Sequence, residues 1–306
     1  MSAMGQRLRE WARTAGYQVA WGPAEPLLSN ARADIGARAG AGELDGDFCR
    51  ERLGAFKYCE GLAFSPRTVI MASVPRPAHR LTAKAGGEQV DLIIPPTYLH
   101  YREIAQQVRH DLARTVKSAQ LALLSAPLKA VAARLGLVTY GRNNITYVPG
   151  HGSYHQLVGF VTDAEPSPES EPGGRDPEAM EACEGCDLCR RACPTGAIGS
   201  DRFLLRGHRC GALATETEGA WPEWVPASFH RCVVGCMLCQ EACPENAGLL
   251  RWETAAPLKP AGKGTATATM GETDDTLLAN AMRELEALGL ADNTVERNVK
   301  AVLAGR

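Results

Sequence analysis

Hydrophobic and polar positions along the chain predict a helix, a strand and then a buried core strand. Residues 5–15 place Leu8, Trp11 and Ala12 at helical spacing, and residues 17–21 predict a short strand that ends at Gly22-Pro23. A continuous β-branched and apolar run over 68–74 predicts a central buried strand. A ligand binds at the end of such a strand in an open α/β sheet. The first half of the chain is therefore predicted to be an α/β domain.

Two prolines, Pro95 and Pro96, predict an extended segment that leads into a long helix. Tyr98, His100 and Tyr101 then lie at the predicted helix N-terminus, where a polar or anionic ligand could bind. Packing of these aromatic side chains on the helix is the competing interpretation. One side of the helix is expected to carry Ile104, Val108, Leu112, Val116 and Leu121.

A glycine-rich region follows a second predicted helix over 127–135. Strands are predicted over 145–148 and 154–162, and glycines occur at 136, 141, 150 and 152 around them. Glycines among polar side chains indicate that the backbone approaches something flat or bulky.

Two segments have compositions that do not pack a core, and they divide the chain. Residues 165–178 are acidic and proline-rich, and residues 255–272 are rich in Ala, Pro, Gly and Thr. The predicted units are thus 1–164, 179–254 and 273–306. The last unit is predicted to be a helical hairpin that docks on the body or on a partner, with Thr273 capping its first helix and Asn293 and Glu296 starting its second.

Composition excludes several classes of function. The formal net charge is −2 with no long run of Lys or Arg, so nucleic acid is not an expected partner. No stretch approaches the roughly 20 apolar residues of a membrane span, and the N-terminal residues lack the apolar segment of a signal peptide. We expect a cytoplasmic protein with no membrane contact.

The candidate chemistry lies in the cysteines, of which nine of eleven fall between 183 and 243. The run C-x2-C-x2-C-x3-C-P begins at Cys183, and its last three cysteines and proline are repeated from Cys236 to Pro244. This spacing is typical of 4Fe-4S clusters rather than of disulfides. The cysteine before each proline ligates the other cluster in two-cluster ferredoxins. Cluster one is therefore predicted to use Cys183, Cys186, Cys189 and Cys243.

Cluster two is predicted to use Cys193, Cys236 and Cys239 with one further cysteine. Spacing leaves Cys210 and Cys232 open for this position. The isolated Cys49 and Cys59 are expected to be small buried hydrophobic residues.

Four stretches of the sequence resemble the epoxyqueuosine reductases, which are similar in turn to the core of corrinoid-dependent reductive dehalogenases. These stretches are residues 125–137, 140–144, Gly152-Ser153 with the following strand, and the cysteine region with His208-Arg-Cys210. The resemblance implies an α/β (α+β) fold, with a nitroreductase-like corrinoid-binding domain, a ferredoxin-like double 4Fe-4S domain and a C-terminal helical pair. It favours Cys210 over Cys232. It also implies a cobamide (cobalamin) held base-off against the glycine turns, with contacts from Gly136, Gly141, Arg142, Asn143, Gly152 and Ser153.

One departure from the family concerns proton donation. The resemblance places Leu124 where the epoxyqueuosine reductases carry an aspartate proposed as the proton donor, and leucine cannot donate a proton. The substrate is therefore expected to be a small molecule other than epoxyqueuosine in tRNA. The remaining candidates for the catalytic acid are Tyr98, Tyr101, Tyr140 and His155.

The sequence thus predicts an iron–sulfur oxidoreductase. An external low-potential donor of the ferredoxin or flavodoxin type would supply electrons through two clusters to a cobamide that reduces an organic substrate. A two-cluster electron-transfer protein without corrinoid is the alternative. A flavin or NAD reductase is disfavoured because no G-x-G-x-x-G turn follows a predicted strand.

Overall fold

The protein is described by a computed structural model that covers residues 3–44, 46, 53–85, 88–116, 120–167, 176–177, 179–200, 204–255 and 274–305. Cys49, Thr273 and most of the two predicted linkers lie outside these ranges. Ser167, near the start of the first predicted linker, is buried, and its hydroxyl accepts a hydrogen bond of 2.8 Å from the Trp21 indole. Residues 165–167 therefore still pack on the body of the protein.

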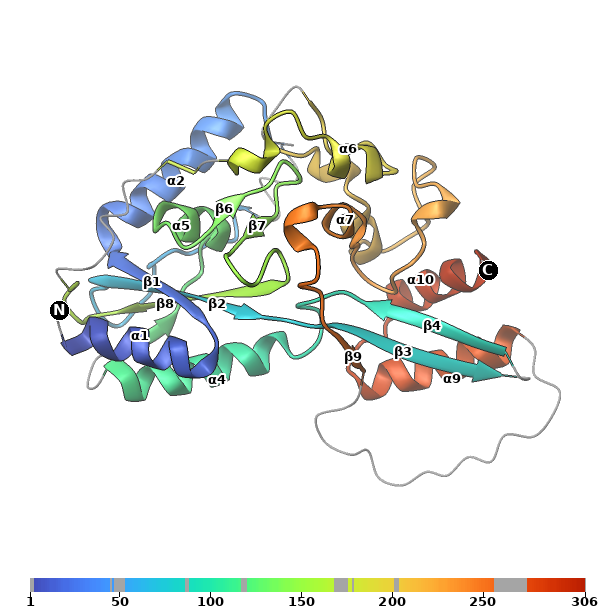
Figure 1. Cartoon of the computed structure of the whole chain (residues 1–306), viewed down its shortest axis with the longest axis horizontal. Helices are drawn as coiled ribbons and strands as arrows, with labels where there is room; N and C mark the ends of the chain where they lie inside the picture. The colour runs from blue at the N-terminus through green and yellow to red at the C-terminus, as the bar shows by residue number, and fades with distance from the viewer. Residues whose placement is uncertain are drawn as a thin grey trace.

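An antiparallel sheet forms the core of the N-terminal part (Figure 1). Its strand order is β1 (Gln18–Pro23), β2 (Thr68–Pro75), β8 (His155–Thr162) and β5 (Leu121–Leu123). Residues 68–74 of β2 are all buried between β1 and β8, so the predicted central strand is confirmed. Because its neighbours run antiparallel, the rule for parallel sheets does not apply to the end of β2.

Helices cover both faces of this sheet, with α1 and α4 on one face and α2 and α5 on the other (Figure 1). Successive side chains of β2 point to opposite faces, so Ile70 and Ala72 pack with the first pair while Val69 and Met71 pack with the second. The bounds are Ala3–Ala15 for α1, Tyr101–Val116 for α4, Ala24–Gly40 for α2 and Leu128–Arg134 for α5.

A second sheet continues from the end of β2 and carries the C-terminal helices. Strand β3 pairs antiparallel with β4 and parallel with β9, and α9 and α10 pack on this sheet (Figure 1). The predicted helical hairpin therefore docks on the body of the protein. The bounds are Ala78–Ala85, Glu88–Ile94 and Trp252–Thr254 for β3, β4 and β9, with Asp274–Ala287 and Asn293–Ala304 for α9 and α10.

The cysteine segment consists of short helices and turns above the two sheets (Figure 1). It contains α6 (Leu188–Ala192), α7 (Gly211–Glu216), α8 (Leu238–Glu241) and four 3₁₀ turns at Glu181–Cys183, Gly207–Arg209, Ala227–Phe229 and Pro244–Asn246. A small hairpin of β6 (Thr139–Tyr140) and β7 (Thr146–Tyr147) lies next to it, and the Met180 amide donates to the Tyr140 carbonyl at 2.7 Å.

Two local predictions are wrong. Leu121 lies in β5 rather than on α4, because the step from Val116 to Leu121 breaks the four-residue spacing of the helix. The cap of α10 is Asp292 rather than Asn293, since the Asp292 carboxylate accepts from the Val295 amide at 2.8 Å. In the described parts of the chain, no helix is long and apolar enough to span a membrane.

Candidate functional site

Four thiols meet around a small cavity, and they are the set predicted for cluster one. Cys183, Cys186, Cys189 and Cys243 line a space of about 50 Å³ together with Arg142. The Arg142 amide donates a hydrogen bond of 3.3 Å to the Cys183 sulfur, and its guanidinium donates one of 2.7 Å to the Cys183 carbonyl. Hydrogen bonds to ligand sulfurs tune the potential of a cluster. The donor set and its surroundings fit a 4Fe-4S cluster.

The thiols proposed for cluster two also lie close enough to interact. Burial raises the pKa of Cys239, and the next largest causes are the charges of Cys236, Cys210 and Cys193. Burial raises the pKa of Cys236 to about 11, with further contributions from Cys210 and Cys193. A buried group of thiolates needs compensating positive charge, which cluster iron supplies. Among the described residues, no three His, Cys, Asp or Glu side chains suit a single metal ion.

Cys232 occupies a different position from Cys210. Burial raises its pKa to about 12, and it shares a narrow space with Arg231, Met237 and Cys236. Its backbone bridges to Ile93 at the edge of the second sheet. Cys232 interacts through its charge with Cys236, whereas Cys210 interacts with Cys193, Cys236 and Cys239. Cys210 therefore interacts with all three of the other thiols predicted for cluster two.

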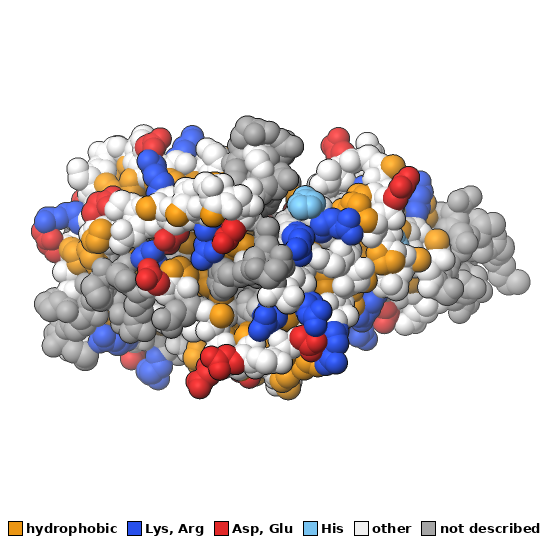
Figure 2. All heavy atoms as spheres, turned by 90° about the horizontal axis from the view of Figure 1, so that it is seen from above, with side chains coloured by type: hydrophobic (Ala, Val, Ile, Leu, Met, Phe, Trp, Pro, Cys, Tyr) orange, Lys and Arg blue, Asp and Glu red, His pale blue; other side chains and the backbone are white. Residues whose placement is uncertain are grey.

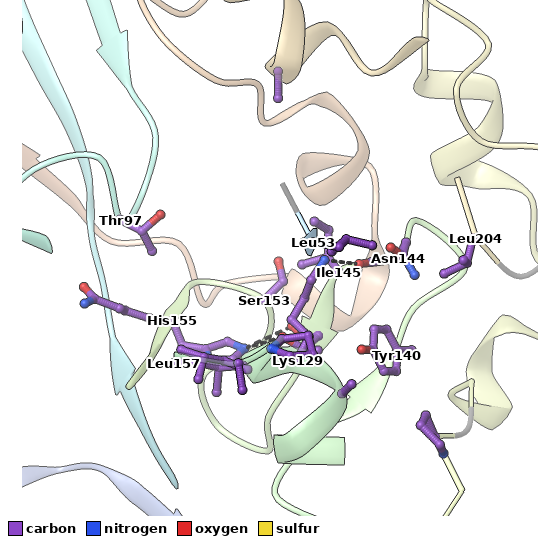
Figure 3. Close-up of a pocket in the computed structure, with 18 of the residues that line it drawn as sticks. Leu53, Thr97, Lys129, Tyr140, Asn144, Ile145, Ser153, His155, Leu157 and Leu204 are labelled. Atoms are coloured by element: carbon purple, nitrogen blue, oxygen red, sulfur yellow. Dashed lines mark hydrogen bonds between the residues drawn. The ribbon is translucent and has the colours of Figure 1, made fainter. Parts of the chain in front are cut away.

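A larger cavity of about 760 Å³, here called the main cavity, lies between the N-terminal sheet and the cysteine segment (Figure 3). Cys236 is part of its wall, so the cavity borders the proposed cluster two. Pockets of about 300–1,000 Å³ are typical of small-molecule sites. The wall also includes Leu53, Phe56, Pro96, Tyr98, Tyr101, Leu124, Ser125, Lys129, Tyr140, Asn144, Ile145, Ser153, His155, Leu157 and Gln240.

All four predicted proton donors line the main cavity, in different environments. Tyr98 donates a hydrogen bond of 2.6 Å to Glu216, and its pKa is raised by burial and then by that carboxylate. Tyr140 is buried, which raises its pKa, whereas Tyr101 is 47% exposed. These positions are compatible with contact to a ligand, but a raised pKa leaves Tyr98 and Tyr140 as weak acids.

His155 is a neutral hydrogen-bonding group rather than an acid near pH 7. Burial lowers its pKa to about 4. Its Nε2 donates to the Thr146 carbonyl at 3.0 Å, while the buried Nδ1 has no hydrogen-bond partner among the described residues. His155 therefore contributes a neutral side chain to the wall of the main cavity.

The predicted cofactor contacts are distributed over both cavities. Ser153 lines the main cavity, whereas Gly141, Arg142 and Asn143 line the space of cluster one. A Cβ on Gly141 would lie 2.5 Å from the side-chain oxygen Oδ1 of Asn143, so glycine permits this close turn.

Gly136 and Gly152 were also predicted as cofactor contacts, but neither belongs to the described wall of the main cavity. Gly136 ends α5 in a left-handed conformation with φ 69°. Gly152 approaches the cysteine segment, where a Cβ would lie 2.4 Å from Asn246 Oδ1.

Sequence reasoning missed Lys129, which also lines the main cavity. Its ammonium donates a hydrogen bond of 3.0 Å to the Asn144 carbonyl (Figure 3). Lys129 is an exposed side chain in the cavity wall, and its charge interacts with that of Cys210. A lone cation in the otherwise apolar stretch from Ser125 to Val131 was the available signal.

The fold and the two thiol sets define an α/β iron–sulfur protein with a double-cluster segment. Residues 182–246 match the family described as "4Fe-4S double cluster binding domain", which confirms the prediction of two 4Fe-4S clusters. The epoxyqueuosine reductase of Synechococcus sp. (strain RCC307) is 38% identical over 124 residues, or 40% of this chain and 36% of that protein. The chain thus aligns with about a third of the length of the curated relatives it matches.

Solved structures extend the likeness to the whole fold. The epoxyqueuosine reductase of Streptococcus thermophilus superimposes with a TM-score of 0.68 at 17% identity, covering 99% of this chain and 82% of that one. That of Bacillus subtilis, with its aspartate-bearing catalytic loop swung out of the active site, gives 0.68 at 21% identity over 99% and 82%. The predicted resemblance and fold class are therefore confirmed.

Proposed function

We propose that the protein is an iron–sulfur reductase that passes low-potential electrons through two 4Fe-4S clusters to a cobamide, which reduces a small organic substrate. One observation carries this proposal: Cys236, a residue in the proposed ligand set of cluster two, is part of the wall of the main cavity. A group bound in that cavity would lie next to the cluster. An electron carrier without a cofactor needs no such cavity.

The proposed ligands of cluster one are Cys183, Cys186, Cys189 and Cys243, and those of cluster two are Cys193, Cys210, Cys236 and Cys239. The crossed pattern is supported by the position of Cys243 beside the first three thiols and of Cys193 beside Cys236. Cluster one would accept electrons from an external donor of the ferredoxin or flavodoxin type.

A cobamide fits the main cavity on three grounds. The volume of about 760 Å³ lies high in the range of small-molecule pockets, and the lining is largely apolar. His155 and Ser153 add two polar residues to that lining. When bound, the cobamide supplies the reducing centre, while the protein excludes water and orients the substrate.

The proposed substrate is a small molecule rather than epoxyqueuosine in tRNA. Leu124, at the position of the family's acid, is buried and forms part of the cavity wall. The net charge of −2 also gives little general attraction for a phosphate backbone. On the face seen from above, basic side chains gather toward the middle, with acidic ones among and around them (Figure 2).

Cobalamin uptake by anaerobically purified, cluster-loaded protein tests the proposal. After incubation and gel filtration, the visible spectrum should show corrinoid that travels with the protein, and iron analysis should give about eight atoms per chain. Full iron content with no retained corrinoid would refute the cobamide proposal and favour the electron carrier.

A pair of tryptophan variants localises the corrinoid. Ile145→Trp should narrow the main cavity and reduce cobalamin uptake at unchanged iron content, because Ile145 is part of its wall. Leu123→Trp is the matched control, since Leu123 is 57% exposed on β5 and is absent from the described wall. Equal uptake by both variants would place the corrinoid elsewhere.

A further inference from the structure

Most charged side chains of the main cavity are already paired. Of the described lining residues, Asp34 accepts hydrogen bonds of 2.8 and 2.7 Å from Arg134. Arg38 donates a hydrogen bond of 2.8 Å to Glu43. These two residues therefore carry charges that are balanced within the protein.

Lys129 differs because its hydrogen-bond partner is a neutral carbonyl. Among the described residues, its ammonium donates to the Asn144 carbonyl at 3.0 Å and to no carboxylate. Lys129 is an exposed side chain where it lines the cavity, and an ammonium has three donors. Two donors and an unbalanced positive charge thus remain for a ligand in the cavity.

The cluster-two thiolates do not account for Lys129 by direct bonding. Lys129 interacts with Cys210 through its charge, but the Cys210 sulfur already accepts hydrogen bonds from the amides of Ala212 and Leu213. The Lys129 ammonium is instead held at the turn between β6 and β7.

We infer that Lys129 binds an anionic group of the substrate, so that the main cavity selects small organic anions such as carboxylates. This inference rests on the proposed function, which makes the main cavity the place of reduction. Lys129 follows Leu124 on the same segment, so the chain that lacks the family's acid at one position presents a cation five residues later. The apolar remainder of the wall would receive the rest of the substrate.

Binding of model anions to cluster-loaded protein without cobamide tests this inference. Benzoate, phenyl phosphate and the neutral benzamide are titrated under anaerobic conditions by calorimetry. A charge-assisted hydrogen bond corresponds to roughly tenfold to a hundredfold in affinity. We expect at least one anion to bind the wild type about tenfold more tightly than benzamide. Lys129→Met should abolish this preference, and Lys129→Arg should retain it.

Arg38→Met provides the control for long-range charge, because Arg38 is a paired cation of the same cavity. We expect it to change anion affinity less than about threefold, well below the effect of a lost charge-assisted bond. Equal losses in Arg38→Met and Lys129→Met would overturn the inference. Wild-type protein that prefers neither anion over benzamide would also overturn it.

Two further arms separate other sources of the anion. Cobinamide lacks the phosphodiester of the cobalamin tail. If Lys129→Met loses affinity for cobalamin but not for cobinamide or the model anions, Lys129 would be assigned to the cofactor. Electron paramagnetic resonance measures the cluster potentials. If Lys129→Met leaves anion binding unchanged but shifts the potential of a cluster, Lys129 would be assigned to cluster two. Both results overturn the inference. Because anion binding is measured without cobamide, a protein that takes up no corrinoid but shows the Lys129-dependent preference would refute only the proposed cofactor.

Discussion

Asn246 joins the cysteine segment to the wall of the main cavity, and its removal should loosen both. It is 4% exposed and follows the last cluster cysteine, Cys243. Its Oδ1 accepts from the Ser153 amide at 2.8 Å, and its Nδ2 donates to the Ser153 hydroxyl and to the Gln240 carbonyl, both at 2.8 Å. One side chain therefore forms two hydrogen bonds across this contact and a third within the cysteine segment.

The magnitude of the loss follows from the groups left behind by Asn246→Ala. The Ser153 hydroxyl keeps its bond of 2.9 Å to the Gln240 side chain, but the Ser153 amide and the Gln240 carbonyl lose a partner. An unsatisfied buried group costs about 1–3 kcal/mol. We take about 3 kcal/mol for the pair, which corresponds to a roughly hundredfold larger population of the locally open state.

Hydrogen–deuterium exchange of the anaerobic, cluster-loaded protein measures that population directly. Peptides that cover residues 150–156 and 238–248 should exchange about a hundredfold faster in Asn246→Ala than in the wild type. Asn280→Ala is the matched control, since the Asn280 amide lies on α9, where it donates a hydrogen bond of 3.1 Å to the Lys84 carbonyl and accepts one of 2.9 Å from Arg283. Unchanged protection of both peptides in Asn246→Ala would refute the reasoning.

Three further predictions test separate parts of the site. Cys210→Ser should lower the iron content from about eight to about four atoms per chain, whereas Cys232→Ser should retain all of it; the opposite result would exchange the two assignments. The pKa of His155 is lowered from 6.5 to about 4, so only the unfolded state binds its proton between these values. Its stabilising contribution is complete above about pH 6.5 and is lost toward pH 4, by at most about 3 kcal/mol. His155→Gln should therefore flatten the pH dependence of the free energy of unfolding, and parallel curves would contradict this. Gly235→Ala would place a Cβ 2.5 Å from the Tyr98 ring at a φ of 67°, so we expect a loss of about 1–3 kcal/mol; an unchanged melting temperature would contradict it.

The cysteines made the double-cluster segment predictable, because a cubane cluster restricts the spacing of its ligands. The strand β2 was predictable for a similar reason, since burial on both faces requires a continuous apolar run. Helix α2 was missed because its Ala- and Gly-rich sequence shows no clear apolar stripe, although Leu27, Leu28 and Ala31 are buried. Strand β4 was not predicted either, although Val90, Leu92 and Ile94 alternate with polar or less buried positions in the pattern typical of a strand.

The glycine turns show what a local pattern leaves open. They were expected to indicate close approach of the backbone to another group, and Gly141 and Gly152 do make such approaches. The group approached cannot be read from the turn itself. Gly152 lies against Asn246, nearly a hundred residues away in the chain, so its partner depends on tertiary contacts. Lys129 is similar, because its role depends on the charges that surround it in the folded cavity.

The contacts across the cysteine segment argue against a detachable electron-transfer module. The Arg142 amide bonds the Cys183 sulfur, Asn246 bonds Ser153, and β9 pairs with β3 beyond the last cysteine. A carrier that shuttles electrons between partners needs only its clusters and an exposed docking surface. Of these contacts, the bond between Asn246 and Ser153 also holds a residue of the main cavity wall. The segment and the cavity are therefore built as one unit, which is the arrangement expected when electrons are delivered to a bound cofactor or substrate.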